Sequence, residues 1–303
     1  MKVKGIHAAP ALVIVVMALT CAAGFADISA ISGGMSPMLT VTVLQLIIIG
    51  IPSVFFCLLR GHEFTKKLRL KLIPARHITM TIYSLAFLVF GSMALNLVMY
   101  KLIPTAFEDA ATSYMSYTVA ESGGAIYAAI SLAIVPAVLE EFLCRGIISA
   151  EYNTYGSLTS VIMSALMFSM LHTSFVRFPI YLFTGVVLSL TASVSSSVLS
   201  SMLVHALNNI FVLFLEPYLY KIAAKSGSGL GLMMFIVVTL MLVFAFLFFM
   251  KAETLYSDRA YANEPAPLVR RRKPNELPHL LQALLSPTFI ILAVFFVVLT
   301  AVN

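Results

Sequence analysis

The chain has 303 residues, of which 60% are hydrophobic and 11% are charged, and its formal net charge is +6. Soluble globular domains are about 45–50% apolar and about a quarter charged, so this composition excludes one. Disordered, collagenous and disulfide-stapled chains are excluded by the same numbers. The three cysteines, Cys21, Cys57 and Cys144, form no CxxC pair and are predicted to be buried free thiols. We predict an all-α, polytopic transmembrane helical bundle.

Apolar segments of about 20 residues, the length that crosses a bilayer, recur nine times along the chain. In chain order they are 8–26, 39–59, 78–100, 124–142, 157–173, 178–196, 198–216, 230–250 and 280–302. We divide the chain into amino-terminal spans with a basic loop (1–119), a helical core (120–217) and carboxy-terminal spans (218–303). The alternative for the first segment is a cleaved signal peptide, since small residues follow it at 22–26.

The basic residues predict the orientation of the bundle. With a cytoplasmic amino terminus, nine spans place regions 1–7, 60–77, 143–156 and 251–279 in the cytoplasm. These regions contain 15 of the 19 Lys and Arg residues, as the positive-inside rule requires. Anionic lipid headgroups then account for the positive charge, so the predicted partners include the lipid bilayer and no nucleic acid. Region 251–279, rich in proline and arginine, is predicted to be an extended linker.

Ionisable side chains inside a bilayer are unfavourable by about 2.5–3.5 kcal/mol each, so the few that the spans contain indicate function. Glu140 and Glu141 lie well inside an apolar segment, whereas only His172 and His205 among the six histidines lie in or near spans. A turn near residues 155–156 is almost equally far from Glu140 and His172. An antiparallel helical hairpin therefore brings the two to a similar depth, provided that the fourth helix continues to about Asn153.

Glu140 and Glu141 are adjacent, so their side chains point about 100° apart on a helix and serve different roles. Arg145 follows Glu141 by four residues, which is the favourable order for an ion pair. We predict that Arg145 neutralises Glu141 and that Glu140 is left to face the histidines. Glu140 is therefore the better catalytic candidate.

Three short motifs follow one another in this region. They are EExxxR (Glu140 to Arg145), FxxxH (Phe168 to His172) and HxxxN (His205 to Asn209). In this order they resemble the CPBP family of intramembrane proteases, also called the Abi or CAAX-protease family, and the resemblance covers 120–217. It implies hydrolysis of a peptide bond within the membrane, in a cavity reached from the cytoplasm. The implied partner is a peptide or a membrane-anchored protein substrate.

The resemblance also implies roles for the motif residues. Glu140 would activate water as the general base, and His172 would orient or share that proton. His205 and Asn209 would stabilise the oxyanion. Glu141, Arg145 and Phe168 are supporting residues, with the ring of Phe168 packing behind His172.

A zinc site is the alternative chemistry, with His172, His205 and Glu140 as ligands. The HExxH motif of zincins is absent from the sequence, so we favour a reaction without a cofactor. The alternative functions are a non-catalytic scaffold or bacteriocin-immunity protein of the same family, and a proton-coupled transporter. No evident repeat of the two halves supports the transporter.

The substrate alternatives are a prenylated CAAX protein, a bacterial peptide and a transmembrane anchor fragment. We expect a multi-pass protein of the cell membrane, in a bacterial plasma membrane rather than the endoplasmic reticulum.

Overall fold

A computed structural model of the chain describes residues 5–25, 36–103, 124–224, 229–261 and 276–302, and every regular element among them is a helix. Six helices are long and apolar enough to cross a membrane, and up to eight if each of two bent pairs is one span. The predicted all-α transmembrane bundle is therefore confirmed. The fifth predicted span, 157–173, corresponds to a shorter apolar helix, Ser157–Leu171, so the count of nine stays a prediction.

The elements follow the predicted spans closely. Those of the first third are α1 (Gly5–Phe25), α3 (Pro37–Gln45), η1 (Leu46–Gly50), α4 (Ile51–Arg60), α5 (His62–Thr65), η2 (Ala75–His77) and α6 (Ile78–Leu102). The central elements are α8 (Ala125–Ala129), η3 (Ile130–Ile134), α9 (Val135–Glu141), η4 (Phe142–Ile148), α10 (Ser149–Tyr152), η5 (Asn153–Tyr155), α11 (Ser157–Leu171), α12 (Phe178–Ser195) and α13 (Val198–Phe214). The last are α14 (Glu216–Ala224), α15 (Gly229–Tyr261), α16 (Glu276–Leu284) and α17 (Pro287–Val302).

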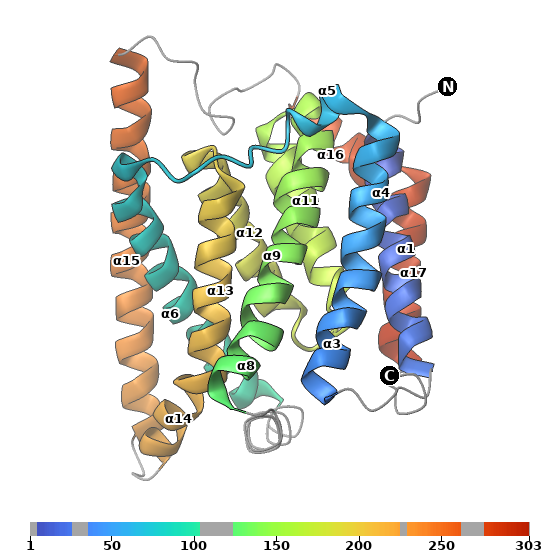
Figure 1. Cartoon of the computed structure of the whole chain (residues 1–303). Coiled ribbons are helices and arrows are strands. Elements are labelled where there is room, and N and C mark those ends of the chain that lie inside the picture. Colours follow the sequence, from blue (N-terminus) through green and yellow to red (C-terminus); the bar gives the residue numbers. More distant parts are fainter. Residues whose placement is uncertain (1–4, 26–35, 104–123, 225–228, 262–275, 303) are drawn as a thin grey trace.

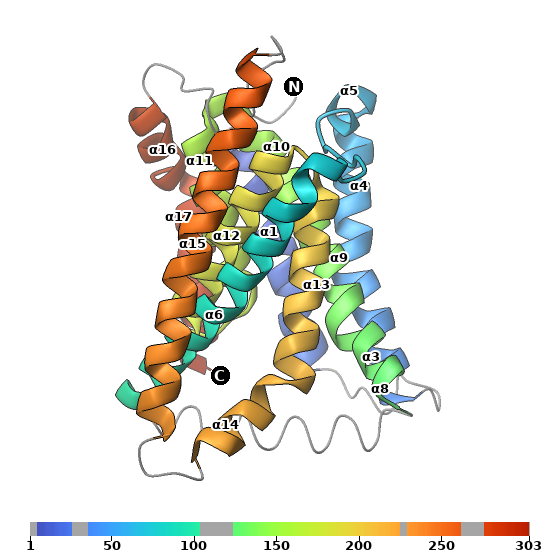
Figure 2. The same ribbon diagram turned by 90° about the vertical axis from the view of Figure 1, so that its left-hand side faces the viewer.

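The long helices run side by side and alternate in direction. Helices α5 and α16 and the last turns of α15 lie at one end of the bundle, whereas α8 and α14 lie at the other (Figure 1). Seen from the side, α10 also lies at the end that holds α5 and α16 (Figure 2). The described parts of regions 60–77 and 251–279, and the α10 part of region 143–156, thus lie at one end of the bundle, as one consistent orientation requires.

The fourth predicted span is much longer than its apolar run. Residues Ala125–Tyr155 form one continuous 31-residue span, as the hairpin argument required. Gly156 then turns the chain with a φ of +124°, a conformation that glycine adopts readily. Helix α11 returns antiparallel, and its Ser160 and Ser164 hydroxyls donate to the carbonyls of Ser149 (3.1 Å) and Cys144 (2.9 Å).

Three π-helical stretches interrupt the spans, and the sequence analysis did not predict them. Two of them, η1 and η3, end two residues before a proline, Pro52 and Pro136 respectively. Proline has no N–H to donate and its ring crowds the carbonyl four residues earlier, so a wider turn there keeps the helix continuous. The third, η4, begins directly after Glu141. Ser164 of the neighbouring helix α11 donates a hydrogen bond to the carbonyl of Cys144 in this stretch.

Three predicted segments differ from the structure in where a helix ends or bends. The linker does not begin at 251, because α15 continues to Tyr261 with Ala252, Leu255 and Tyr256 buried against Met80 and Val194. Span 280–302 is not one straight helix, because α16 and α17 are bent by 53°. Span 198–216 ends earlier, at Phe214, and α14 leaves it at 43°. Proline near each break, Pro217 and Pro287, prevents a continuous helical hydrogen-bond ladder.

Candidate active site

The carboxylate of Glu140 lies close to two imidazoles from two other helices. Its Oε2 atom is 3.8 Å from Nε2 of His172, which follows α11, and 3.9 Å from Nε2 of His205 on α13. The structure therefore brings together Glu140 and His172, which the depth argument paired, and places His205 beside them. Both separations exceed hydrogen-bonding distance, so a polar molecule of the size of water fits the bridging role.

Each imidazole is fixed through its other ring nitrogen. Nδ1 of His172 lies 2.9 Å from the carbonyl oxygen of Phe168, and Nδ1 of His205 lies 3.0 Å from Oε1 of Glu141. A carbonyl and an ionised carboxylate only accept hydrogen bonds, so each Nδ1 donates. Neutral imidazoles then present the Nε2 lone pair to Glu140. Three acceptor atoms consequently surround one position.

The side chains of the site differ in their exposure. The side chains of Glu140 and His172 are 18% and 22% exposed, whereas those of Glu141 and Arg145 are fully buried and that of His205 is 5% exposed. Glu140 and His172 are thus partly accessible, whereas His205 and the Glu141–Arg145 pair behind it are buried.

Arg145 supports the site from inside the protein. Its Nη1 donates to Oε1 of Glu141, which is the predicted pair, and its Nη2 donates to the carbonyl of Gly185 at 2.8 Å. The guanidinium also lies over the ring of Phe168, 4.6 Å from its centroid. Two predictions are corrected here. Arg145 is buried in the bundle rather than part of a cytoplasmic region, and Glu141 holds His205 in addition to pairing with Arg145.

Gly185 of α12 permits this arrangement, and no sequence motif contains it. A Cβ atom at this position would lie 2.9 Å from Cα and 3.0 Å from the carbonyl oxygen of Ala165. Backbone atoms of α11 cannot yield as a flexible side chain can. Only glycine therefore lets α12 approach α11 closely enough for its carbonyl to reach Arg145.

Replacement of Gly185 by alanine is accordingly expected to separate α12 from α11 and to weaken the bond to Arg145. Overpacking of this kind is destabilising by about 1–3 kcal/mol, and we expect reduced cleavage activity as well. Thermal unfolding in detergent and a peptide-cleavage assay measure the two effects. Gly231→Ala is the matched control, because a Cβ there meets no atom within 4 Å. Equal behaviour of the two variants would contradict the role of Gly185.

Asn209 does not contact Glu140 or the histidines through any described hydrogen bond. Its Nδ2 donates to the carbonyl of Ala133 in η3 at 3.4 Å, and the residue is half-buried. Its role as an oxyanion donor stays a prediction. It requires release of this long bond when substrate binds.

Aromatic rings surround His172. The Phe168 ring lies 4.8 Å away between centroids, in line with the predicted packing. The Tyr181 ring of α12 stacks at 3.9 Å with an interplanar angle of 22°. Tyr181 was missed by the sequence analysis, since it belongs to none of the three motifs.

The basic loop that precedes α6 is fastened to the core. Arg69 donates through Nη2 to the carbonyl of Arg145 at 3.4 Å and through Nη1 to that of Ala192 at 3.5 Å. The backbone N–H of Val198 donates to the carbonyl of Arg69 at 3.1 Å. Arg69, predicted as part of the cytoplasmic anchor, therefore also ties this loop to η4, α12 and α13.

The candidate zinc ligands were assessed as a set. In the part of the chain that the structure describes, no three His, Cys, Asp or Glu side chains are placed to hold a metal ion together. Zinc binding by Glu140, His172 and His205 stays an alternative prediction.

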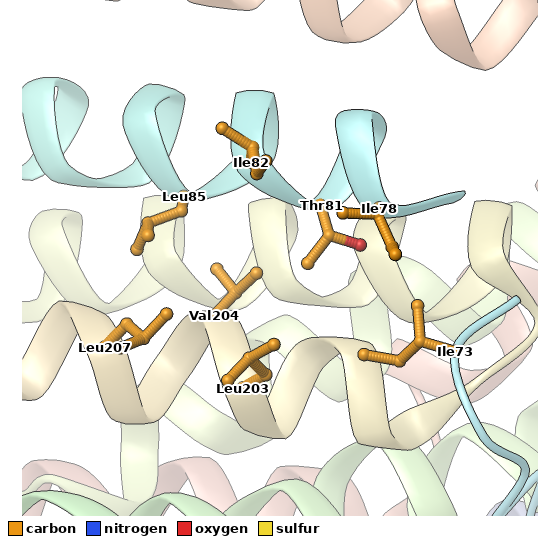
Figure 3. A pocket seen from close by; sticks show the side chains of 8 residues that line it. All are labelled: Ile73, Ile78, Thr81, Ile82, Leu85, Leu203, Val204 and Leu207. Carbon is orange, nitrogen blue, oxygen red and sulfur yellow. The ribbon is translucent and has the colours of Figure 1, made fainter. Parts of the chain in front are cut away.

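A separate apolar pocket of about 90 Å³ lies between α6 and α13 (Figure 3). Its lining residues are aliphatic apart from Thr81; they are Ile73, Ile78, Thr81, Ile82, Leu85, Leu203, Val204 and Leu207. No carboxylate or imidazole lines it, so it is distinct from the Glu140 site.

Comparison with known protein families gives a match to the segment that contains this site. The sequence model of the family described as "Type II CAAX prenyl endopeptidase Rce1-like" matches residues 122–211, a segment that includes Glu140, His172, His205 and Asn209. No curated protein and no solved structure matches the chain. The apolar helices make the chain a multi-pass membrane protein. Residues 122–211 of this chain are therefore similar to a family described as CAAX prenyl endopeptidases.

Proposed function

We propose that this chain is an intramembrane endopeptidase in which Glu140 activates the attacking water molecule. The observation that carries the proposal is the convergence of Glu140 Oε2 and two Nε2 atoms within 3.9 Å, with both Nδ1 atoms anchored elsewhere. A water molecule at this position can donate its two hydrogens to Glu140 and to His172. It is thereby oriented and polarised for attack.

In the proposed reaction, Glu140 takes one proton from this water while the water oxygen bonds to the carbonyl carbon of the substrate. His172 accepts a hydrogen bond from the same water and shares the proton. For His205 to stabilise the oxyanion, its neutral imidazole first takes a proton from solvent at Nε2. The Nε2–H then donates to the oxyanion, and the Nδ1–H stays on Glu141. The C–N bond then breaks, and the proton held by Glu140 and His172 passes to the leaving amine.

The substrate proposed first is a prenylated carboxy-terminal peptide or protein. The description of the matching family names prenyl endopeptidases, and the site lies among membrane-spanning helices. We further propose that the end of the bundle with α5 and α16 faces the cytoplasm and that the protein resides in a bacterial plasma membrane. The asymmetry of Lys and Arg supports this orientation.

The experiment that tests the function is cleavage by the purified, full-length protein in detergent or proteoliposomes. Farnesylated, geranylgeranylated and unmodified CAAX peptides are compared, and mass spectrometry identifies the bond that is cut. We expect cleavage of a lipidated peptide and little of the unmodified one. If the folded protein cleaves none of these peptides, the result contradicts the proposed endopeptidase function and favours the scaffold alternative.

Removal of metal is expected to leave the activity within about a factor of two, because the proposed chemistry needs no Lewis acid to activate water. The purified protein is treated with EDTA and with 1,10-phenanthroline, dialysed and assayed on the same peptide. A zinc-dependent metalloprotease assayed in parallel shows that the chelators work. Activity lost to chelation and restored by Zn²⁺ would instead establish the zinc alternative.

A further inference from the structure

His172 stands at a point where the backbone provides little support for its ring. It is the residue directly after α11, and the next residue, Thr173, has a φ of +43°, which is uncommon for a side chain branched at Cβ. Its ring makes one described hydrogen bond, from Nδ1 to the carbonyl of Phe168. A single bond leaves the ring able to rotate about that contact, which would turn Nε2 away from Glu140.

The ring of Tyr181 removes this freedom. It lies nearly parallel to the imidazole, 3.9 Å away between centroids, whereas Phe168 is tilted by 59° at 4.8 Å. A parallel neighbour at van der Waals distance blocks rotation of the imidazole out of its plane. The hydrogen bond to Phe168 and the stacked ring of Tyr181 therefore fix the orientation of the His172 imidazole together.

Tyr181 lies on the face of helix α12 that also contacts Arg145. Tyr181 and Gly185 are four residues apart, so they occupy neighbouring positions on one face of the helix. One contacts His172, and the other accepts the hydrogen bond from Arg145. The close approach that Gly185 permits thus also sets the distance from Tyr181 to His172.

We propose that Tyr181 is a positioning residue, whose stacked ring fixes the plane of His172 so that Nε2 faces Glu140. The proposal rests on the proposed function. It concerns the aromatic ring of Tyr181 and not its hydroxyl group. Tyr181→Phe keeps the stack, whereas Tyr181→Leu removes it and retains an apolar side chain.

The kinetic test compares these two variants with the wild type on the peptide that the wild type cleaves. Tyr181→Leu is expected to lower kcat by about tenfold or more with little change in KM, because a misplaced catalytic group slows the reaction without weakening substrate binding. Tyr181→Phe is expected to restore kcat to nearly the wild-type value. Tyr83→Leu is the control, since Tyr83 lies on α6 and its ring contacts Phe244 instead of the site.

A second measurement does not depend on cleavage. Carbethoxylation of His172 by diethyl pyrocarbonate, followed by mass spectrometry, is expected to be faster in Tyr181→Leu and unchanged in Tyr181→Phe and Tyr83→Leu. If Tyr181→Leu does not fold, Tyr181→Met replaces it in both measurements. The proposal is overturned if the modification rate or kcat of Tyr181→Phe matches that of Tyr181→Leu, or if Tyr181→Leu behaves as the wild type. An inactive wild type with the expected modification pattern would refute the proposed function alone.

Discussion

Replacement of Glu140 by glutamine is expected to reduce peptide cleavage by at least a factor of about 100, since general-base catalysis contributes about 10²–10⁴. The amide has nearly the same shape as the carboxylate but accepts no proton from water. Glu140 is partly exposed and its carboxylate makes no ion pair with Lys or Arg among the described residues, so the change leaves no buried charge without a partner. The variant should therefore fold and insert as the wild type does.

The rate of cleavage under single-turnover conditions measures this effect, and thermal unfolding in detergent reports on the fold. Glu63→Gln is the matched control, because Glu63 lies in α5 with an exposed side chain that pairs with Lys66. We expect wild-type cleavage from that control. Normal turnover by Glu140→Gln would remove Glu140 from the mechanism and leave the cluster without a base.

His172 offers a further check on the same step. If Glu140 and His172 handle one proton together, the double variant Glu140→Gln/His172→Gln should be little slower than the slower single variant. Residues that act as a unit show this lack of additivity. Fully additive losses in the logarithm of the rate would mean that the two side chains act independently.

The parts of this site that spacing determines were predictable from the sequence. The i,i+4 relation joined Glu141 to Arg145, and equal distances from the turn at Gly156 brought Glu140 to the depth of His172. Both inferences need only helical geometry and one turn. The overall bundle was predictable for a similar reason, because the local composition of the sequence determines the apolar length of each span.

The contacts between distant helices were not predictable in this way. Tyr181 and Gly185 act through α12, whose rotation about its axis depends on packing against α11 and not on any local pattern. The continuation of α15 beyond residue 251 was missed for a related reason. Its charged residues dominate the local composition, whereas Ala252 and Leu255 are buried only because α6 and α12 lie beside them.

Replacement of Arg145 by methionine is expected to be the most destabilising change at the site. The guanidinium and the Glu141 carboxylate are both fully buried, so the variant leaves a buried carboxylate without its cationic partner. Removing one partner of a buried pair lowers the free energy of unfolding by about 3–5 kcal/mol. The bond to Gly185 and the contact with the Phe168 ring are lost as well. Thermal unfolding in detergent measures the effect.

The double variant Arg145→Met/Glu141→Leu separates stability from catalysis. Apolar residues in place of a buried ion pair are often neutral for stability, so most of the lost stability should return. Activity should not return, because Nδ1 of His205 then has no carboxylate acceptor and its Nε2 is no longer directed at Glu140. Glu141→Gln, which keeps an acceptor oxygen, should retain more activity than the double variant. A double variant that is both stable and fully active would show that His205 reaches Glu140 without Glu141, and the pair would then be a packing element alone.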